Sequence, residues 1–102
     1  MIKRSTGIEI LDAPAMPMGV MEADGFRCLS TIVHPGDQIV MMTDGIVDSR
    51  REDLELNWLK KLMRQMKPKD PQPISDLLIR EAAENYGQRE KDDMTVISLV
   101  VR

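Results

Sequence analysis

Apolar residues in the first half of the chain come in short runs separated by turn signals. Residues 1–4 and 7–11 flank a Ser-Thr-Gly tripeptide and predict a hairpin. Gly25–Val33 alternates imperfectly between apolar and polar positions and predicts another strand. The run Ile39–Thr43 shows no polar alternation, so it predicts a strand that is buried on both faces.

Two proline-containing stretches separate these runs. Asp12–Gly19 holds two prolines and one glycine, a composition that predicts a loop rather than a helix. His34–Asp37 carries a Pro-Gly pair and predicts a turn, because proline presets one dihedral angle and glycine permits an unusual one. The first half is therefore expected to be β structure joined by turns and loops.

The period of the apolar positions changes after residue 50. Arg51–Lys67 and Ile74–Tyr86 repeat apolar residues at three- and four-residue spacing, which predicts two amphipathic helices separated by prolines. Met94–Val101 is nearly continuous in apolar content and predicts a final strand. Strands followed by two helices and one strand favour an α+β fold with helices on one face of a mainly antiparallel sheet. The predicted apolar stripes consist of Leu54, Trp58, Leu59, Leu62, Met63 and Met66, and of Ile74, Leu77, Leu78, Ala82 and Tyr86.

Composition narrows the functional classes. The 102 residues suit one small domain, and the net charge of -3 without a basic stripe argues against a nucleic-acid partner. No apolar run is long enough to cross a membrane and no signal peptide is recognised, so we expect a cytoplasmic chain without a membrane segment. The single cysteine, Cys28, excludes an internal disulfide and is expected to be a buried structural thiol.

Acidic residues stand at the ends of two predicted strands. Asp44 follows the strand Ile39–Thr43, and Asp92 with Asp93 precedes the final strand. If the two strands are antiparallel neighbours, these carboxylates converge at one sheet edge. Converging carboxylates repel unless a cation separates them, and Mg²⁺ or Mn²⁺ prefers such oxygen ligands. Gly45 would then let the backbone turn sharply and approach a ligand closely.

Other interpretations of the same residues stay open at this point. Asp-Gly is a common turn dipeptide, and spacing alone favours turns over a metal site. Asp48 lies just before a predicted helix and suits an N-cap role. His34 is the sole histidine and has no metal-binding partner, which argues against zinc.

Residues 17–20, 35–48 and 92–97 are three blocks that together resemble the metal-dependent serine/threonine protein phosphatases of the type 2C family, in particular the stage II sporulation protein E-like branch. Residues 35–48 are similar to that family's block of Pro-Gly-Asp, then Thr-Asp-Gly and a later acidic residue. Residues 92–97 resemble its closing Asp-(Asp/Asn)-x-Thr strand, and Pro17–Val20 resembles its Pro-Leu-Gly block. Order and spacing agree over nearly the whole chain.

The resemblance implies the C-terminal half of an α-β-β-α sandwich, with a binuclear Mn²⁺ or Mg²⁺ centre between two sheets. It implies that Asp44 and Asp92 ligate one metal, with Asp93 orienting the site from outside the ligand set and Gly45 supporting it. A metal-activated water would attack phosphoserine or phosphothreonine in a protein substrate. The family thus implies a hydrolase that acts in signalling during sporulation.

The sequence departs from the family in lacking its N-terminal Asp-Gly metal motif and a sheet's worth of strands. Asp24-Gly25 lies in the wrong place and is expected to be a turn. Residues 1–102 are thus expected to form a partial phosphatase domain that is inactive alone, with exposed strand edges that favour homo-oligomers or strand exchange. The competing hypothesis is a non-catalytic module for protein binding or dimerisation; a general phosphate or nucleotide hydrolase ranks last.

Overall fold

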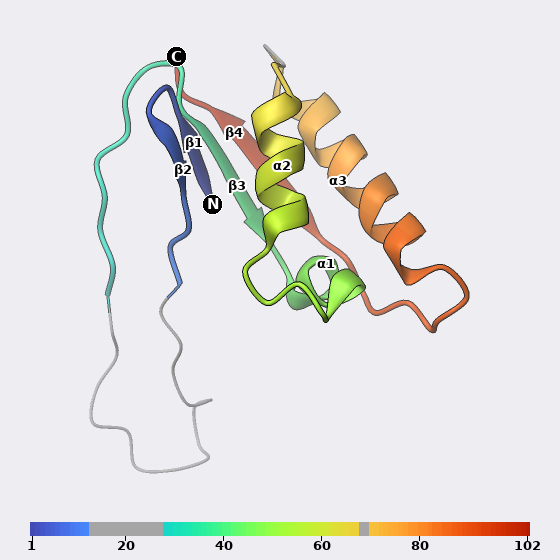
Figure 1. Ribbon diagram of the computed structural model, residues 1–102. Coiled ribbons are helices and arrows are strands. Elements are labelled where there is room, and N and C mark those ends of the chain that lie inside the picture. The colour runs from blue at the N-terminus through green and yellow to red at the C-terminus, as the bar shows by residue number, and fades with distance from the viewer. Residues whose placement is uncertain (13–27, 68–69) are drawn as a thin grey trace.

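A computed structural model of the protein describes residues 1–12, 28–67 and 70–102. Short strands come first, helices follow, and one strand closes the described chain (Figure 1). The elements are β1 (Ile2–Arg4), β2 (Gly7–Glu9), β3 (Gln38–Met42), α1 (Asp44–Val47), the 3-10 turn η1 (Asp48–Arg50), α2 (Asn57–Gln65), α3 (Pro71–Tyr86) and β4 (Val96–Val100).

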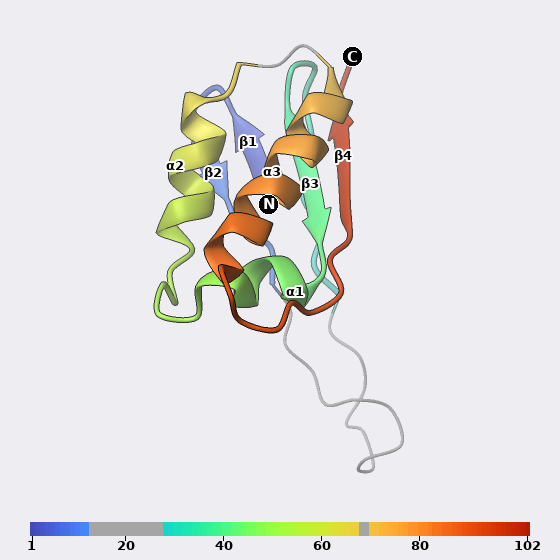
Figure 2. The ribbon, with the colours of Figure 1, turned by 90° about the vertical axis from the view of Figure 1, so that its right-hand side faces the viewer.

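The strands form one sheet in the order β2-β1-β3-β4, and every neighbouring pair is antiparallel. Helices α2 and α3 lie together on one face of this sheet, as Figure 2 shows from the helical side. The predicted α+β class, the antiparallel sheet and the two amphipathic helices before the last strand are confirmed. None of the helices in the described ranges is long and apolar enough to cross a lipid bilayer.

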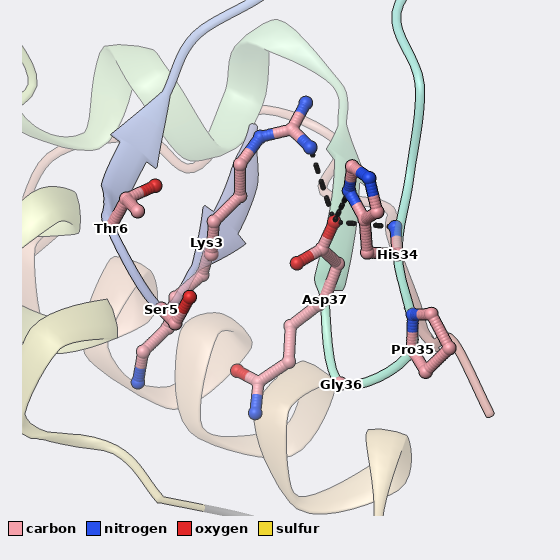
Figure 3. A pocket seen from close by; sticks show the side chains of 9 residues that line it. Lys3, Ser5, Thr6, His34, Pro35, Gly36 and Asp37 are labelled. Carbon is pink, nitrogen blue, oxygen red and sulfur yellow. Dashed lines mark hydrogen bonds and ion pairs between the residues drawn. The ribbon is translucent and has the colours of Figure 1, made fainter.

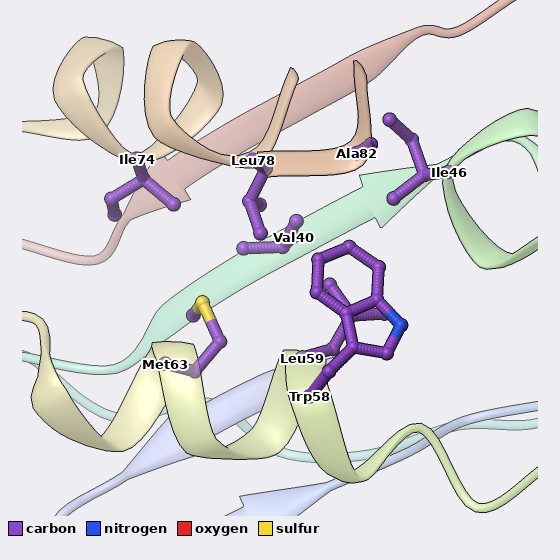
Figure 4. Close-up of a cluster of buried hydrophobic side chains, with 8 residues drawn as sticks. All are labelled: Val40, Ile46, Trp58, Leu59, Met63, Ile74, Leu78 and Ala82. Atoms are coloured by element: carbon purple, nitrogen blue, oxygen red, sulfur yellow. The ribbon is translucent and has the colours of Figure 1, made fainter. Parts of the chain in front are cut away.

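The hydrophobic core lies between the helices and the sheet. Side chains from α2 and α3 meet those of β3 and α1 there (Figure 4). Large buried aliphatic groups dominate because the chain has few aromatic residues. The core residues are Val40, Ile46, Trp58, Leu59, Met63, Ile74, Leu78 and Ala82.

The sheet face that points away from the helices is apolar and exposed. Met41 pairs with Ile97 across β3 and β4, and each side chain is 51% exposed. Leu99, on the same face, is 44% exposed. The prediction that Ile39–Thr43 is buried on both faces is therefore wrong for this chain, because among the described residues nothing covers the second face.

Helix α2 begins six residues later than the predicted helix Arg51–Lys67. Leu56 has a positive φ of 57°, which a right-handed helix does not accommodate, so the residues before it form turns. Asp53 accepts hydrogen bonds from the backbone N–H of Trp58 and the side chain of Asn57, which fixes the new helix start. Leu54 consequently leaves the predicted stripe and is 89% exposed.

Helix α3 begins earlier than predicted, at Pro71, because prolines are tolerated in the first turn, where no intrahelical N–H bond is lost. The final strand is shorter than Met94–Val101 and spans Val96–Val100. The buried residues of α3 are the predicted ones at four-residue spacing: Ile74, Leu78, Ala82 and Tyr86.

Two predictions about the segment after residue 27 are wrong. Residues 28–33 form no strand, since no backbone ladder bonds are made by them within the described residues; Arg4 donates hydrogen bonds to the hydroxyl of Thr31 and the carbonyl of Ile32. Cys28 is exposed rather than buried. The remaining predictions for this region, the strand start at Gly25, the loop after Asp12, the Pro17–Val20 block and the Asp24-Gly25 turn, fall on residues 13–27, outside the described residues.

Candidate metal centre

Acidic residues meet at one end of the sheet, where β3 ends and β4 begins. Asp44 follows β3, and Asp92 precedes β4. Strands β3 and β4 are antiparallel, with Met42 opposite Val96, so the end of β3 lies beside the start of β4. Carboxylate oxygens of Asp44, Asp48 and Asp92 all lie within 4.8 Å of one another. The convergence of Asp44 and Asp92 that strand order predicted is therefore observed.

Backbone pairing continues past the ends of the strands and fixes this edge. The N–H of Thr43 donates to the carbonyl of Thr95 at 3.1 Å, and the N–H of Thr95 donates to Oγ1 of Thr43 at 3.0 Å. The residue before Asp44 is thus bonded to the segment that carries Asp92. The two carboxylates are held on adjacent, mutually bonded chain segments.

Gly45 permits the close contact between these two segments. A Cβ atom added at this position would lie 2.0 Å from the carbonyl oxygen of Asp93 and 2.9 Å from its carbonyl carbon. Both are backbone atoms, which have little freedom to move aside. The predicted sharp turn at Gly45 is wrong, because the residue is helical in α1; the tight approach is to the chain itself.

The hydroxyl of Tyr86 anchors α1 through a hydrogen bond. It is buried and donates to the carbonyl oxygen of Gly45 at 2.5 Å. Tyr86 ends α3, so the position of α1 depends on the long helix that covers the sheet. The acidic edge is in this way connected directly to the hydrophobic core.

Asp92 and Asp93 differ in what they contribute. The Oδ1 atom of Asp92 accepts a hydrogen bond from the N–H of Asp93 at 2.8 Å, which orients the Asp92 carboxylate. The contacts of Asp93 with α1 and its neighbour are made by its backbone carbonyl, toward Gly45 and Oγ1 of Thr43. The predicted role of the Asp93 side chain in orienting the site stays a prediction.

Asp48 belongs to this cluster, although the sequence pattern predicted that it would be a helix N-cap. It does not cap the helix that follows; it is the C-cap residue of α1 and the first residue of η1, and it is half-buried. Residues four apart share one face of a helix, and Asp44 and Asp48 have that spacing. Two signals could have identified Asp48: its spacing of four residues from Asp44, and the later acidic residue of the family block that residues 35–48 resemble.

Within the described part of the chain, no ion pair balances the charge of the cluster. Among residues 1–12, 28–67 and 70–102, no lysine, arginine or histidine forms an ion pair with Asp44, Asp48 or Asp92. Three carboxylates at such short range repel one another in water. Two of them are exposed, and all offer hard oxygen donors, so the arrangement fits a divalent cation such as Mg²⁺ or Mn²⁺.

The opposite end of β3 carries an aspartate in a very different setting. Asp37 is 8% exposed, and its Oδ2 atom lies 3.1 Å from the guanidinium of Arg4 and 2.8 Å from the backbone N–H of His34 (Figure 3). An open pocket of about 450 Å³ lies beside this turn. His34 belongs to this end of the sheet, away from the acidic cluster, and is 72% exposed.

Comparison with protein families finds that the model described as "Stage II sporulation protein E (SpoIIE)" matches residues 1–102. The stage II sporulation protein E of Bacillus subtilis strain 168 is 34% identical over 94% of this chain, which spans 12% of that protein. The protein of the same name from Priestia megaterium is 30% identical over 94% of this chain, which spans 17% of it. The chain thus covers a small part of these relatives.

Solved structures of the Bacillus subtilis protein are also similar. Its phosphatase domain is 33% identical, with a TM-score of 0.72, over 98% of this chain and 43% of that domain. A structure of its PP2C phosphatase domain with a fragment of the regulatory domain gives a TM-score of 0.85 at 31% identity, over 98% of this chain and 30% of that one. A further structure of the phosphatase domain, described as a crystal form without domain swapping, matches with a TM-score of 0.73 at 32% identity, over 95% of this chain and 43% of that one.

Proposed function

The chain belongs to the stage II sporulation protein E family, and on this premise we propose that it forms the C-terminal half of a protein phosphatase domain. The reaction is metal-dependent hydrolysis of phosphoserine or phosphothreonine in a protein substrate. The observation that carries the proposal is the cluster of Asp44, Asp48 and Asp92, whose carboxylate oxygens lie within 4.8 Å of one another.

In this proposal Asp44 and Asp92 hold one Mn²⁺ or Mg²⁺ of a binuclear centre. Asp48 is a third oxygen donor, which the geometry adds to the two aspartates expected from the sequence. The metals would supply an acidified water and neutralise the charge that develops on the phosphate. The chain's own residues position the carboxylates: the Asp93 N–H fixes Asp92, while Gly45 and Tyr86 fix α1, which carries Asp44.

The remainder of the domain would cover the bare sheet face. Related phosphatase domains extend well beyond this chain, which spans 43% of one of them. An open apolar depression of about 750 Å³ lies beside Met41 and Ile39 and reaches Asp44. A second sheet packed there would bury this surface and bring further ligands to the acidic edge. By itself the fragment is expected to bind metal weakly and to be inactive.

Calorimetric titration with Mn²⁺ tests the metal site. The wild-type chain should bind Mn²⁺ weakly, and Asp44→Asn or Asp92→Asn should reduce the affinity on the order of tenfold or more. Asp76→Asn is the matched control, because Asp76 is an exposed aspartate on α3, outside the cluster. Equal Mn²⁺ affinity in all four proteins would refute a site at Asp44 and Asp92.

Complementation tests the activity. The chain is mixed with a separately produced N-terminal half of a phosphatase domain from the same family, and release of phosphate from a phosphoserine protein is measured with and without Mn²⁺. Activity should require both halves and the metal, and Asp44→Asn should abolish it. A complex that forms but shows no metal-dependent hydrolysis would remove the enzymatic proposal.

A second candidate function, a non-catalytic module for protein binding or dimerisation, is favoured by the exposed apolar residues Met41, Ile97 and Leu99. Two copies could cover these faces mutually or exchange edge strands. Light scattering after size-exclusion chromatography distinguishes a homo-oligomer from a monomer. Met41→Lys should return such an oligomer to the monomer without changing Mn²⁺ affinity. For either function we propose a cytoplasmic location.

A further inference from the structure

Arg89 lies in the loop that leads from α3 to β4, three positions before Asp92. Its backbone N–H donates to the carbonyl of Tyr86 at 3.0 Å, and the N–H of Gly87 donates to the carbonyl of Glu84 at 3.0 Å. These bonds continue the turn at the end of α3, so they fix the backbone of Arg89 relative to the helix. Figure 2 shows this loop passing α1 on its way to β4.

The guanidinium of Arg89 makes contacts on two sides. Its Nη2 atom donates to the backbone carbonyl of Ser49 and, at 3.5 Å, to that of Asn85. Its Cζ atom lies 5.0 Å from the centroid of the Tyr86 ring, a distance at which a cation is attracted to the ring face. Arg89 is exposed, but a planar group that lies on a ring and donates from its edge has a defined orientation.

Ser49 is the residue through which Arg89 contacts the segment of the acidic cluster. Ser49 is 1% exposed and directly follows Asp48 in η1. Its Oγ donates to the carbonyl of Ile46 at 2.7 Å and accepts a bond from Nδ2 of Asn85 at 3.3 Å. Together with the bond from Arg89 to its carbonyl, these bonds join η1 to the end of α3.

Asp48 depends on this connection more than the other two aspartates do. Asp44 lies next to the backbone pairing between β3 and β4, and Asp92 is oriented by the N–H of Asp93. Asp48 lies one turn beyond Asp44, after a helix of four residues, which is too short to be stable by its own bonds. The charges of Asp44 and Asp92 also repel it when no cation is bound. Contacts from outside α1 are therefore needed to hold Asp48 in place.

We propose that Arg89 is a positioning residue of the candidate metal centre: by holding the Ser49 carbonyl, it keeps the Asp48 carboxylate within reach of the ion that Asp44 and Asp92 bind. This role rests on the proposed metal site, in which Asp48 is a third oxygen donor. Electrostatics alone predicts the opposite effect, because the positive charge of Arg89 repels a cation. Weaker metal binding after removal of that charge is thus a signature of positioning.

Calorimetric titration of the full chain with Mn²⁺ measures the effect. Arg89→Gln should raise the dissociation constant about fivefold, less than the loss of a direct partner of a ligand, because Arg89 acts through the backbone. Arg89→Lys should recover part of this loss, since it retains a charged donor. Arg80→Gln is the matched control: it removes the same charge from an exposed position of α3 that makes none of these contacts, and it should not weaken binding.

Two results of this titration have different meanings. If the wild type binds Mn²⁺ and Arg89→Gln binds it equally well or more tightly, the role of Arg89 is refuted while the metal site stands. If the wild type itself binds no Mn²⁺, the metal site is refuted, and the role of Arg89 with it.

Asp48→Asn tests the route through which Arg89 acts. This variant leaves Asp44 and Asp92 in place, so binding should be weakened rather than abolished. In the Asp48→Asn background, Arg89→Gln should change the dissociation constant by less than about twofold, because the ligand that Arg89 positions is already lost. An equal loss in both backgrounds would show that Arg89 acts on the fold as a whole, and would overturn the proposal.

Amide hydrogen exchange in EDTA provides a measurement without metal. The Asp48 N–H donates to the carbonyl of Asp44, so its exchange reports opening of α1. Arg89→Gln should speed exchange of this N–H on the order of fivefold and leave that of Leu78, in the buried face of α3, unchanged. Unchanged exchange at Asp48, or equal acceleration at Asp48 and Leu78, would overturn the positioning role.

Discussion

The two ends of strand β3 each carry an aspartate, and the two are treated in opposite ways. Asp37, just before the strand, is buried and paired with the guanidinium of Arg4. Asp44, just after it, is exposed and lies within 4.8 Å of two further carboxylates. A buried charge with an ion-pair partner is compatible with a stable fold, whereas a cluster of like charges without one lowers the stability unless a cation binds. Within the described residues, the difference separates an end of the sheet whose charge is paired from an end whose carboxylates have no ion-pair partner.

The largest expected effect comes from adding an atom to the close contact at Gly45, beside the acidic cluster. In Gly45→Ala the new Cβ would lie 2.0 Å from a backbone oxygen, so α1 must move and the free energy of unfolding should fall by about 3 kcal/mol. Gly36→Ala is the control at the other end: its φ of +93° is strained but the space is open, so we expect a loss of about 1 kcal/mol. Urea unfolding measures both. A larger loss for Gly36→Ala would contradict the packing described at Gly45.

The next effect concerns the compensated aspartate. Asp37→Ala leaves Arg4 without its buried partner and the N–H of His34 without an acceptor, so the free energy of unfolding should fall by about 2 kcal/mol. Ser5→Ala, at an exposed position of the same pocket, should change it by less than about 0.5 kcal/mol. If Asp37→Ala were as neutral as Ser5→Ala, the paired end would not be structural.

Asp44→Asn should change the free energy of unfolding in the opposite direction. Without divalent metal it removes one of three mutually repelling charges, so the free energy of unfolding should rise by about 0.5 kcal/mol. In millimolar Mn²⁺ the wild type should gain stability by ligand binding, and the variant should gain less. Thermal unfolding with EDTA and with Mn²⁺ gives the four values. Destabilisation of the metal-free protein would show that Asp44 supports the fold as Asp37 does.

Asp53 is a half-buried aspartate that has hydrogen-bond partners but lies outside the acidic cluster. The backbone N–H of Trp58 lowers the pKa of the Asp53 carboxyl, so its ionised form is favoured in the folded protein. Its contribution to stability is therefore present above the ordinary aspartate pKa of about 3.9 and is lost as the pH falls through the lower, folded-state pKa. NMR titration of the carboxyl checks the direction of the shift. Acid unfolding of Asp53→Asn should lose this part of the pH dependence; an unchanged profile would remove Asp53 from it.

Much of the fold followed from local patterns. Residues Ile74, Leu78, Ala82 and Tyr86 share one helical face, and burial of that face requires no knowledge of the rest of the chain. The hairpin β1–β2 and the turn at Gly36 likewise follow from short-range turn chemistry. The start of α2 did not, because a left-handed Leu56 and the bonds accepted by Asp53 override the apolar period that includes Leu54.

By itself, the sequence determined the order of the main strands and helices and the buried face of α3, and it placed Asp44 and Asp92 at strand ends, because period and turn residues act over a few positions. Only the tertiary structure decided that Asp48 joins them, that Gly45 is needed for contact with the Asp93 carbonyl, and that Arg4 contacts the segment 28–33, which forms no strand. These features depend on segments up to about fifty positions apart in the chain that meet when β3 pairs with β4 and α3 covers the sheet. Local pattern carries no information about such distant contacts, which arise when burial of the core fixes the arrangement of the elements.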